Sequence, residues 1–222
     1  MSHIQIALDG PSGAGKSSLA KAIAHTLGIV YVDTGALYRT VGYYARAIGL
    51  PADKVEIAPI VNHLHEITIE VKYESGVQCV YLNGENLGDR IRSSDMSMYA
   101  SAVSAVPAVR AFLLDTQKDI ARKSSVIMDG RDIGTIVLPR AQVKIYLTAS
   151  SAVRAKRRYD ELILKGQEVT FKDVYDDMVK RDYNDMNRAI TPLRKAEDAV
   201  EIDSTSMSIE EVVDFICRPI EQ

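Results

Sequence analysis

The chain has 222 residues, of which 46% are hydrophobic and 26% are charged, and its formal net charge is −3 at pH 7. This length suits one large domain or two small ones, and the nearly balanced charge argues against a general binder of nucleic acid polymers or membrane surfaces. Two cysteines, Cys79 and Cys217, are too few and too far apart to indicate a disulfide framework or a zinc site.

The start of the chain, MSHIQIALDG, lacks the basic residues and the long apolar stretch of a signal peptide. No apolar run approaches the length needed to span a membrane. We therefore expect a cytoplasmic protein without a membrane partner. The mixed charge and the absence of a heptad pattern favour a monomer.

The first fifty residues alternate between strand and helix patterns. Residues 4–8 form a short apolar run, and helical spacing of apolar residues follows from Lys16 to a stop at Gly28. A second apolar run, 29–33, precedes another helical pattern, which Thr34 is expected to cap. This order predicts a parallel sheet covered by helices.

The middle of the chain breaks this alternation. The segment ITIEVKY, residues 67–73, alternates apolar and polar residues, and residues 77–87 supply a second strand and an Asn-Gly turn. We expect a small antiparallel insert at about 67–93. Two helices should follow, at 95–105 and 107–122, the second starting at Pro107.

The remaining pattern returns to buried strands and helices. We expect strands at 125–129, 143–149 and 199–203, and helices at 151–165, 170–188 and 208–218. There is no internal repeat and no clear interdomain linker. The prediction is one α/β domain, 1–222, with a parallel sheet flanked by helices on both faces and a small antiparallel insert.

The segment GPSGAGKS matches the phosphate-binding pattern G-x-x-x-x-G-K-[ST] and lies between a strand and a helix, as that pattern requires. Glycines let backbone N–H groups converge on phosphate oxygens, and the helix N-terminus adds its positive dipole. A simple connecting turn has no need of a lysine and a serine in this register. Lys16 is expected to reach the β- and γ-phosphates and Ser17 to ligate Mg²⁺. The predicted ATP-binding residues are Gly10, Pro11, Ser12, Gly13, Ala14, Gly15, Lys16, Ser17 and Ser18.

The loop alone does not separate switches, motors and kinases. A guanine-specific switch is expected to carry an Asn-Lys-x-Asp segment, which does not occur here. Most helical arginines are solvated or paired, and Arg181 has the spacing of an ordinary i, i+4 pair with Asp185. Arg131 differs because it lies in a glycine-punctuated turn just after a buried strand, where α/β folds bind ligands.

Five segments together resemble the bacterial cytidylate kinase family over essentially the whole chain. They are GPSGAGKSS, DTGALYR, ASAVSAVPAVR, DGRDIGT and RDYNDMNRAITPL, in the order of that family, and the insert at 67–93 also matches it. The resemblance implies transfer of the γ-phosphoryl group of ATP to CMP or dCMP, with Mg²⁺ bound to ATP. It also implies a monophosphate-binding region at 34–93 and a helical lid at 151–188.

The resemblance also implies roles for particular residues. Lys16, Arg131, Arg154 and Arg158 are expected to act on the transferring phosphoryl group, the last two approaching one phosphate chain together because they lie one helical turn apart. Thr34 stands where the family commonly has serine, and its hydroxyl is retained. The implied CMP-binding residues are Thr34, Arg39, Ser101, Arg110, Arg131, Asp132, Arg181, Asp185 and Arg188.

Cytosine recognition has a chemical logic at these positions. A carboxylate such as Asp132 can accept a hydrogen bond from the exocyclic amino group of cytosine but repels the corresponding carbonyl of uracil. Arg110 can donate to the ring acceptors, and Ser101 can do either. Without the resemblance, Ser101 fits helix packing and Arg110 a solvated helix. Asp129 either joins the Mg²⁺ shell or braces the loop, and all four histidines are interpreted as structural or surface residues.

Two alternative functions stay open at the level of sequence. The first is a kinase of the same fold that phosphorylates UMP, AMP or a small alcohol. The second is a regulator that binds ATP or GTP without transferring phosphate. Asp132 discriminates against the first, because a carboxylate facing the base suits an amino-bearing pyrimidine.

Overall fold

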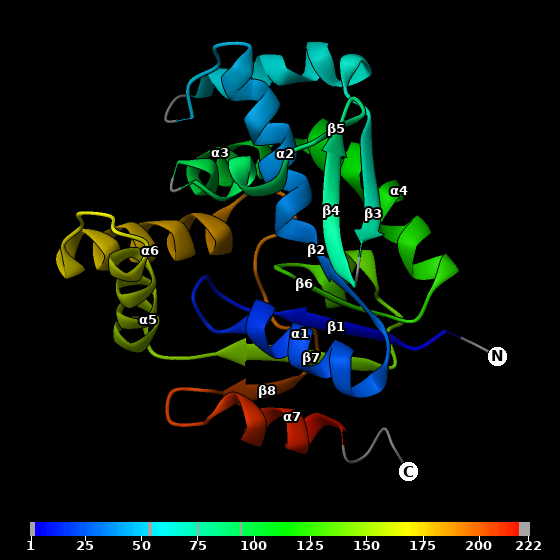
Figure 1. Cartoon of the computed structure of the whole chain (residues 1–222), viewed down its shortest axis with the longest axis vertical. Coiled ribbons are helices and arrows are strands. Elements are labelled where there is room, and N and C mark those ends of the chain that lie inside the picture. Colours follow the sequence, from blue (N-terminus) through cyan, green and yellow to red (C-terminus); the bar gives the residue numbers. More distant parts are fainter. Residues whose placement is uncertain (1–2, 53–54, 75, 94, 218–222) are drawn as a thin grey trace. The chain divides into compact units, whose positions relative to one another are not determined.

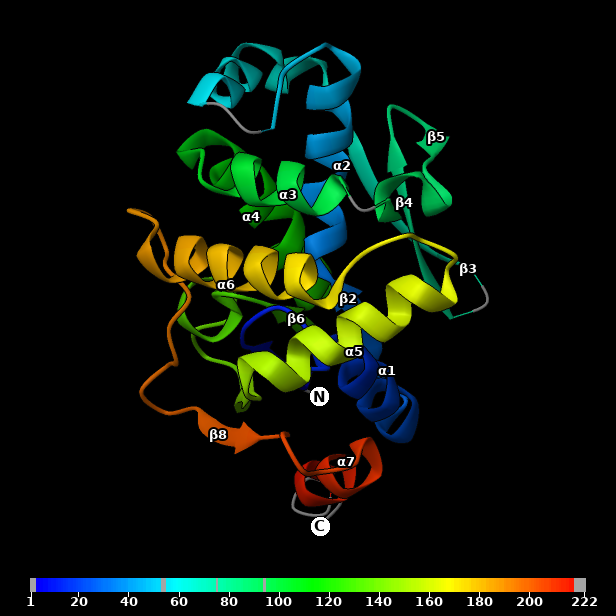
Figure 2. The same cartoon turned by 90° about the vertical axis from the view of Figure 1, so that its left-hand side faces the viewer.

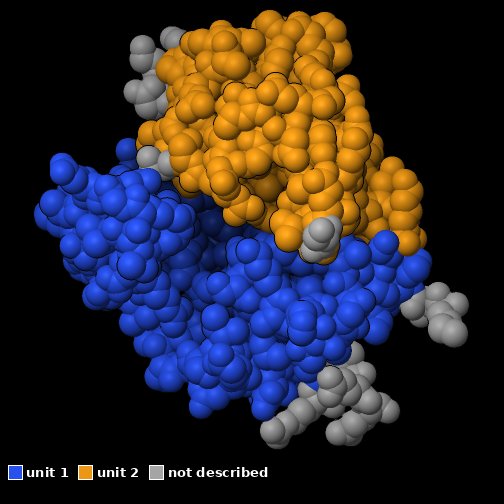
Figure 3. Space-filling model, in the orientation of Figure 1, with its two compact units in different colours: residues 1–31, 124–222 blue, residues 32–123 orange. Residues whose placement is uncertain are grey.

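A computed structural model of the chain describes residues 3–52, 55–74, 76–93 and 95–217. The chain divides into two compact units, coloured separately in Figure 3. Unit 1 combines residues 1–31 with 124–222, and unit 2 is residues 32–123.

The parallel sheet has the strand order β2-β6-β1-β7-β8 (Figure 1), and its strands belong to unit 1 except for the last two residues of β2, Val32 and Asp33, which fall in unit 2. The central strand β1 pairs in parallel with β6 and β7, and β7 pairs in parallel with β8. Four residues of β1, Ile6 to Asp9, are buried, as expected for a strand covered on both faces. The strands are β1 (Gln5–Asp9), β2 (Val30–Asp33), β6 (Val126–Gly130), β7 (Val143–Thr148) and β8 (Val200–Asp203).

Helices of unit 1 share a core with this sheet. Ile23 of α1, Leu8 of β1 and Val212 of α7 belong to one cluster of buried side chains. The helices α5 and α6 are joined by a short connection and pack against each other, as both cartoon views show (Figure 2). The helices are α1 (Lys16–Leu27), α5 (Ser151–Leu164), α6 (Phe171–Asn187) and α7 (Ile209–Cys217), with a short π-helical turn, η3 (Ile133–Val137).

Among the described residues, unit 2 contains the antiparallel insert and five helical segments, with a second buried cluster at its core. Its sheet has the order β3-β4-β5, and the turn between β4 and β5 uses positive φ at Asn83 (50°) and Gly84 (83°), the conformation that Asn-Gly hairpin turns need. The elements are α2 (Thr34–Ala47), η1 (Val55–Glu66), β3 (Ile69–Glu74), β4 (Val77–Leu82), β5 (Glu85–Asn86), η2 (Gly88–Arg92), α3 (Met96–Ser104) and α4 (Pro107–Lys123).

The predicted fold class is confirmed, and most predicted boundaries agree with the structure to within two residues. One local prediction was wrong. Asp33, not Thr34, caps α2, because its carboxylate accepts the backbone N–H of Ala36 at 2.9 Å. Thr34 is instead the first residue of the helix and is 3% exposed. The single-domain prediction stays a prediction.

Among the described residues, no single helix is long and apolar enough to cross a membrane. The helices α3 and α4 meet that length and composition only when taken together, and they are bent by 99° at their junction.

Candidate active site

The phosphate loop connects β1 to α1 and depends on glycine at its start. Gly10 has a φ of 146°, and a Cβ there would lie 2.0 Å from the carbonyl oxygen of Leu147 on the neighbouring strand β7. Gly15 adopts a left-handed conformation (φ 93°) at the start of α1, which has no side-chain cap. The first N–H groups of the helix are therefore available to an anion, as phosphate-binding loops require.

The side chain of Lys16 folds back onto the phosphate loop. Its side chain is buried, and Nζ donates to the carbonyl oxygen of Pro11 at 2.7 Å. Burial, followed by the nearby charge of Arg131, lowers the pKa of Lys16 well below its usual value. An anion beside this ammonium offsets both effects, because it stabilises the charged form.

Ser17 and Asp129 bring two side-chain oxygens together at the end of the loop. The Ser17 hydroxyl donates to Oδ2 of Asp129 at 2.8 Å, and the Tyr31 hydroxyl donates to Oδ1 at 3.2 Å. Mg²⁺ is commonly held by one or two protein oxygens together with substrate phosphates and water. Among the residues described here, no group of three or more His, Cys, Asp or Glu is placed to hold a metal. The Ser17 and Asp129 oxygens thus fit an ion that arrives with a nucleotide.

Arginines of α5 and α6 surround the phosphate loop. Arg154 is buried, donates to the Ser12 carbonyl oxygen at 2.8 Å and pairs with Asp182 at 2.7 Å. Arg181 lies close to the Ser12 hydroxyl, with its Nη1 at 3.5 Å. Positive charge from two helices therefore reaches the loop that is expected to hold phosphates.

Arg154 and Arg158 have different partners in this structure. Arg158 pairs with Glu161 at 2.8 Å on the more exposed side of α5. The neighbouring Arg157 instead contacts Ser204 at 2.8 Å, and its Nη1 would lie 3.9 Å from a Cβ added at Gly15. Arg157 is therefore the second arginine of α5 beside the loop.

The predicted acceptor residues of unit 1 form a cluster of charges in which the carboxylates are buried and the arginines half-buried. Arg131 pairs with Asp185 at 2.8 Å, and Arg188 lies 3.8 Å from Asp132. Although burial acts to raise the pKa of Asp185, Arg131 and then Arg181 hold it below its usual value. The structure thus brings together the arginines and carboxylates that the sequence places in DGRDIGT and in RDYNDMNRAITPL.

Four further predicted acceptor residues belong to unit 2. Arg39 pairs with Asp33 at 2.7 Å, and Arg110 donates to the Ser104 carbonyl oxygen at 3.2 Å and lies over the ring of Tyr38. Arg110 is 9% exposed, which excludes the fully solvated interpretation. Thr34, Arg39, Ser101 and Arg110 lie on α2, α3 and α4.

Three polar residues at the site were not predicted from the sequence. Asp9 accepts two backbone hydrogen bonds from the turn after Arg131. Asp182 pairs with Arg154, and the Ser204 hydroxyl lies 3.2 Å from the carbonyl oxygen of Ala14 in the loop. The sequence offered a signal for Asp9, because it is the last residue of the strand that precedes the phosphate loop. It offered none for Ser204, because Ser204 and Ala14 are 190 residues apart in the chain.

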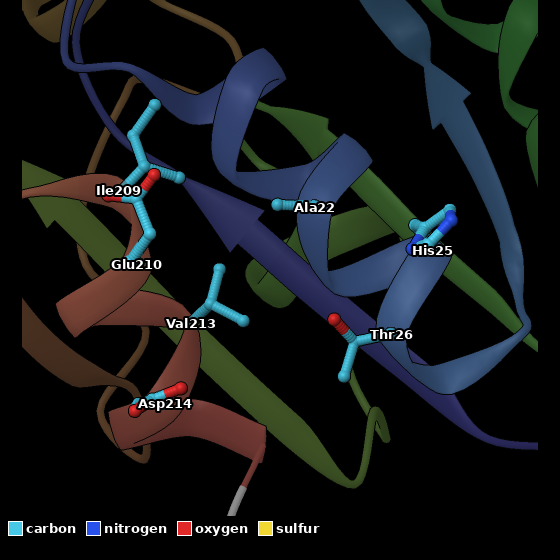
Figure 4. A pocket seen from close by; sticks show the side chains of 7 residues that line it. All are labelled: Ala22, His25, Thr26, Ile209, Glu210, Val213 and Asp214. Atoms are coloured by element: carbon cyan, nitrogen blue, oxygen red, sulfur yellow. The ribbon is translucent and has the colours of Figure 1, made fainter.

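A small cavity of about 290 Å³ lies elsewhere in unit 1, between α1 and α7 (Figure 4). No predicted site residue lines it, and it offers no basic side chain besides His25 for a phosphate. The lining residues are Ala22, His25, Thr26, Ile209, Glu210, Val213 and Asp214.

Comparison with known proteins identifies the relatives of this chain. A family model described as "Cytidylate kinase" matches residues 6–222. The cytidylate kinase of Caldicellulosiruptor bescii is 49% identical over 214 residues, covering 96% of this chain and 93% of that protein. That of Clostridium tetani is 44% identical over 219 residues, covering 99% and 94%. A crystal structure of an uncharacterized protein from Eubacterium ventriosum has a TM-score of 0.51 at 15% identity and covers 99% of each chain, a likeness of fold alone.

Proposed function

The chain belongs to the cytidylate kinase family, and on that premise we propose that it transfers the γ-phosphoryl group of ATP to CMP or dCMP, giving ADP with CDP or dCDP. The observation that carries this proposal is the cluster of charge beside the phosphate loop, in which Lys16 and Arg154 are buried and Arg131 is half-buried. Phosphoryl transfer requires chiefly positioning and positive charge, and it needs no covalent nucleophile.

We assign the ATP phosphates to the loop and the start of α1, residues 10–18. Lys16 would leave the Pro11 carbonyl and pair with the β- and γ-phosphates. Ser17, with Asp129 behind it, would hold Mg²⁺. That ion neutralises charge on the β- and γ-phosphate oxygens when it is bound.

We assign the stabilisation of the transferring group to arginines. Arg131 and Arg154 are held in place by carboxylates, Asp185 and Asp182, so each guanidinium is oriented before substrates bind. Arg158 completes the predicted set from the exposed side of α5, and would have to exchange its Glu161 partner for phosphate. Excluding water from these groups prevents wasteful hydrolysis of ATP.

We assign CMP to the nine residues that the family resemblance implies, with separate tasks for the phosphate, sugar and base. Arg39, Arg131 and Arg181 would bind the phosphate, and Asp185 a ribose hydroxyl. Asp132 would accept from the cytosine amino group, aided by Arg188, which lies 3.8 Å from it. Arg110 and Ser101 would contact the ring acceptors, and Thr34 would contribute its hydroxyl.

A coupled assay of ADP release tests the function directly. The purified protein is supplied with Mg²⁺, ATP and, one at a time, CMP, dCMP, UMP, AMP and GMP. We expect CMP and dCMP to give the highest kcat/KM values. ADP release with UMP or AMP equal to that with CMP would favour a related kinase with another acceptor. ATP binding without ADP release specific to any monophosphate would favour a regulator.

The cytoplasmic location and the monomeric state stay predictions from the sequence. Neither is needed for the proposed reaction, because the assay uses the isolated protein.

A further inference from the structure

Asp9 is a buried carboxylate to which the proposed reaction gives no task. It is the last residue of β1 and is 4% exposed. Its Oδ1 accepts the backbone N–H of Ile133 at 2.8 Å, and its Oδ2 accepts that of Gly134 at 2.7 Å. Both oxygens of one side chain are therefore used by two consecutive peptide groups, 124 and 125 residues away in the chain.

These two peptide groups begin the π-helical turn η3. The first N–H groups of a helical turn have no partner within the turn, so a side chain must supply one. Asp132, which precedes the turn, makes no side-chain cap. Asp9, which lies on the strand β1, caps the turn instead. The cap is therefore supplied by a residue far from the turn in the sequence.

The residues just before this turn are Arg131 and Asp132. In the proposed reaction, Arg131 binds phosphate and Asp132 binds the cytosine amino group. The residue just after Asp9 is Gly10, where the phosphate loop begins. We propose that Asp9 is a positioning residue that fixes the acceptor-binding loop, residues 131–135, to the strand that carries the phosphate loop. This inference rests on the proposed function, because it assigns Asp9 to the placement of the CMP-binding residues.

The energetic cost of Asp9 supports a positioning role. An isolated buried carboxylate destabilises a fold unless its hydrogen bonds are satisfied, and an apolar residue would fill the end of β1 without that cost. Burial is also the main reason that the pKa of Asp9 is raised, to about 6, against the opposing effect of the two N–H groups. The charged groups that act on it are Asp132 and Lys16.

The phosphate loop has other supports, so the two substrates should respond differently to a change at Asp9. Arg154 binds the Ser12 carbonyl, Ser204 lies on the Ala14 carbonyl, and Gly10 packs against Leu147. In contrast, the first two N–H groups of the turn, those of Ile133 and Gly134, donate only to Asp9 among the hydrogen bonds described. Loss of Asp9 should therefore disturb CMP binding more than ATP binding.

The test is the Asp9→Asn variant, assayed for both substrates. An amide can accept only one of the two N–H groups and presents its own N–H to the other. We expect KM for CMP to rise about tenfold or more while KM for ATP changes by less than about threefold. A purely structural role would lower the melting temperature and the active fraction and leave both KM values unchanged, and that result would overturn the proposal.

A second variant keeps the test open if Asp9→Asn does not fold. In Gly134→Ala, the added Cβ would lie 3.3 Å from both Oδ2 of Asp9 and Cδ of the flexible Lys144 side chain, so the contact between Asp9 and the turn is crowded from the side of the turn. It should raise KM for CMP in the same direction but by less. Asp119→Asn, which removes an exposed carboxylate from α4, is the control for loss of charge and should change neither KM.

The experiment separates the inference from the function. Wild-type protein without CMP-dependent ADP release would contradict the proposed function. Wild-type activity with CMP, together with unchanged KM values in Asp9→Asn, or in Gly134→Ala where Asp9→Asn does not fold, would overturn the role of Asp9 alone.

Discussion

Buried charge is concentrated in unit 1, where side chains from distant segments neutralise one another. Lys16, Asp129 and Asp132 are each at most 6% exposed. Burying such groups costs several kcal/mol unless they are paired or hydrogen-bonded, so their partners are part of the design of the site. Sequence alone indicated which of these residues carry charge to the site, but not their partners, because pairs such as Arg131 with Asp185 join residues 54 positions apart.

Removing Asp185, the buried member of its ion pair with Arg131, should be costly. In Asp185→Ala, the half-buried Arg131 loses its ion-pair partner, and we expect the free energy of unfolding to fall by about 2 kcal/mol. Urea denaturation checks this. Asp176→Ala, which removes the exposed partner of Lys172 on the same helix, should cost less than about 1 kcal/mol. Equal losses in the two variants would contradict the account.

The raised pKa of Asp9 predicts a pH dependence of stability. Burial raises its pKa from 3.8 to about 6, so between these values the folded protein binds more protons than the unfolded chain. The free energy of unfolding contributed by Asp9 must then fall as pH rises through this window. Relative to Asp9→Asn, the wild type should lose up to about 3 kcal/mol between pH 4 and pH 7, measured by urea denaturation. Parallel pH profiles for the two proteins would contradict this assignment.

At the level of elements, periodicity predicted the regular helices and strands, and the irregular ones escaped it. The helices α1, α4 and α5 begin and end within about two residues of their predicted bounds. The 3-10 helix η1 and the π-helical turn η3 were not predicted, because neither follows the spacing of an α-helix or a strand. The cap of α2 was assigned to Thr34 rather than to Asp33, since both residue types favour caps and only the backbone decides between them.

Close packing of α2 on α3 depends on a glycine that the sequence analysis did not single out. A Cβ at Gly42 would lie 2.7 Å from Cβ of Tyr99 and 3.1 Å from its backbone carbon. Gly42→Ala should therefore destabilise unit 2 by about 1–3 kcal/mol, although alanine favours helix formation by about 1 kcal/mol. A lower melting temperature checks this prediction. A variant as stable as the wild type would show that α2 and α3 can separate without cost.

At the level of the whole molecule, the proposed acceptor residues are shared between the two units. Unit 2 carries Thr34, Arg39, Ser101 and Arg110, and unit 1 carries the other five together with the phosphate loop. The family and the reaction were predictable because short segments along the entire chain match one family. The contacts that orient these residues were not predictable from the sequence, because they depend on which distant segments the fold places side by side.

The central claim is that the phosphate loop acts on any acceptor, whereas Asp132 selects the base. The most direct test compares kcat/KM for CMP and UMP in the wild type, Lys16→Met and Asp132→Ala. Lys16→Met should lower both values about 100-fold or more and leave their ratio within about threefold, because it removes charge from the transferring phosphoryl group. Asp132→Ala should reduce the CMP to UMP ratio about tenfold or more. An unchanged ratio in Asp132→Ala would contradict the account.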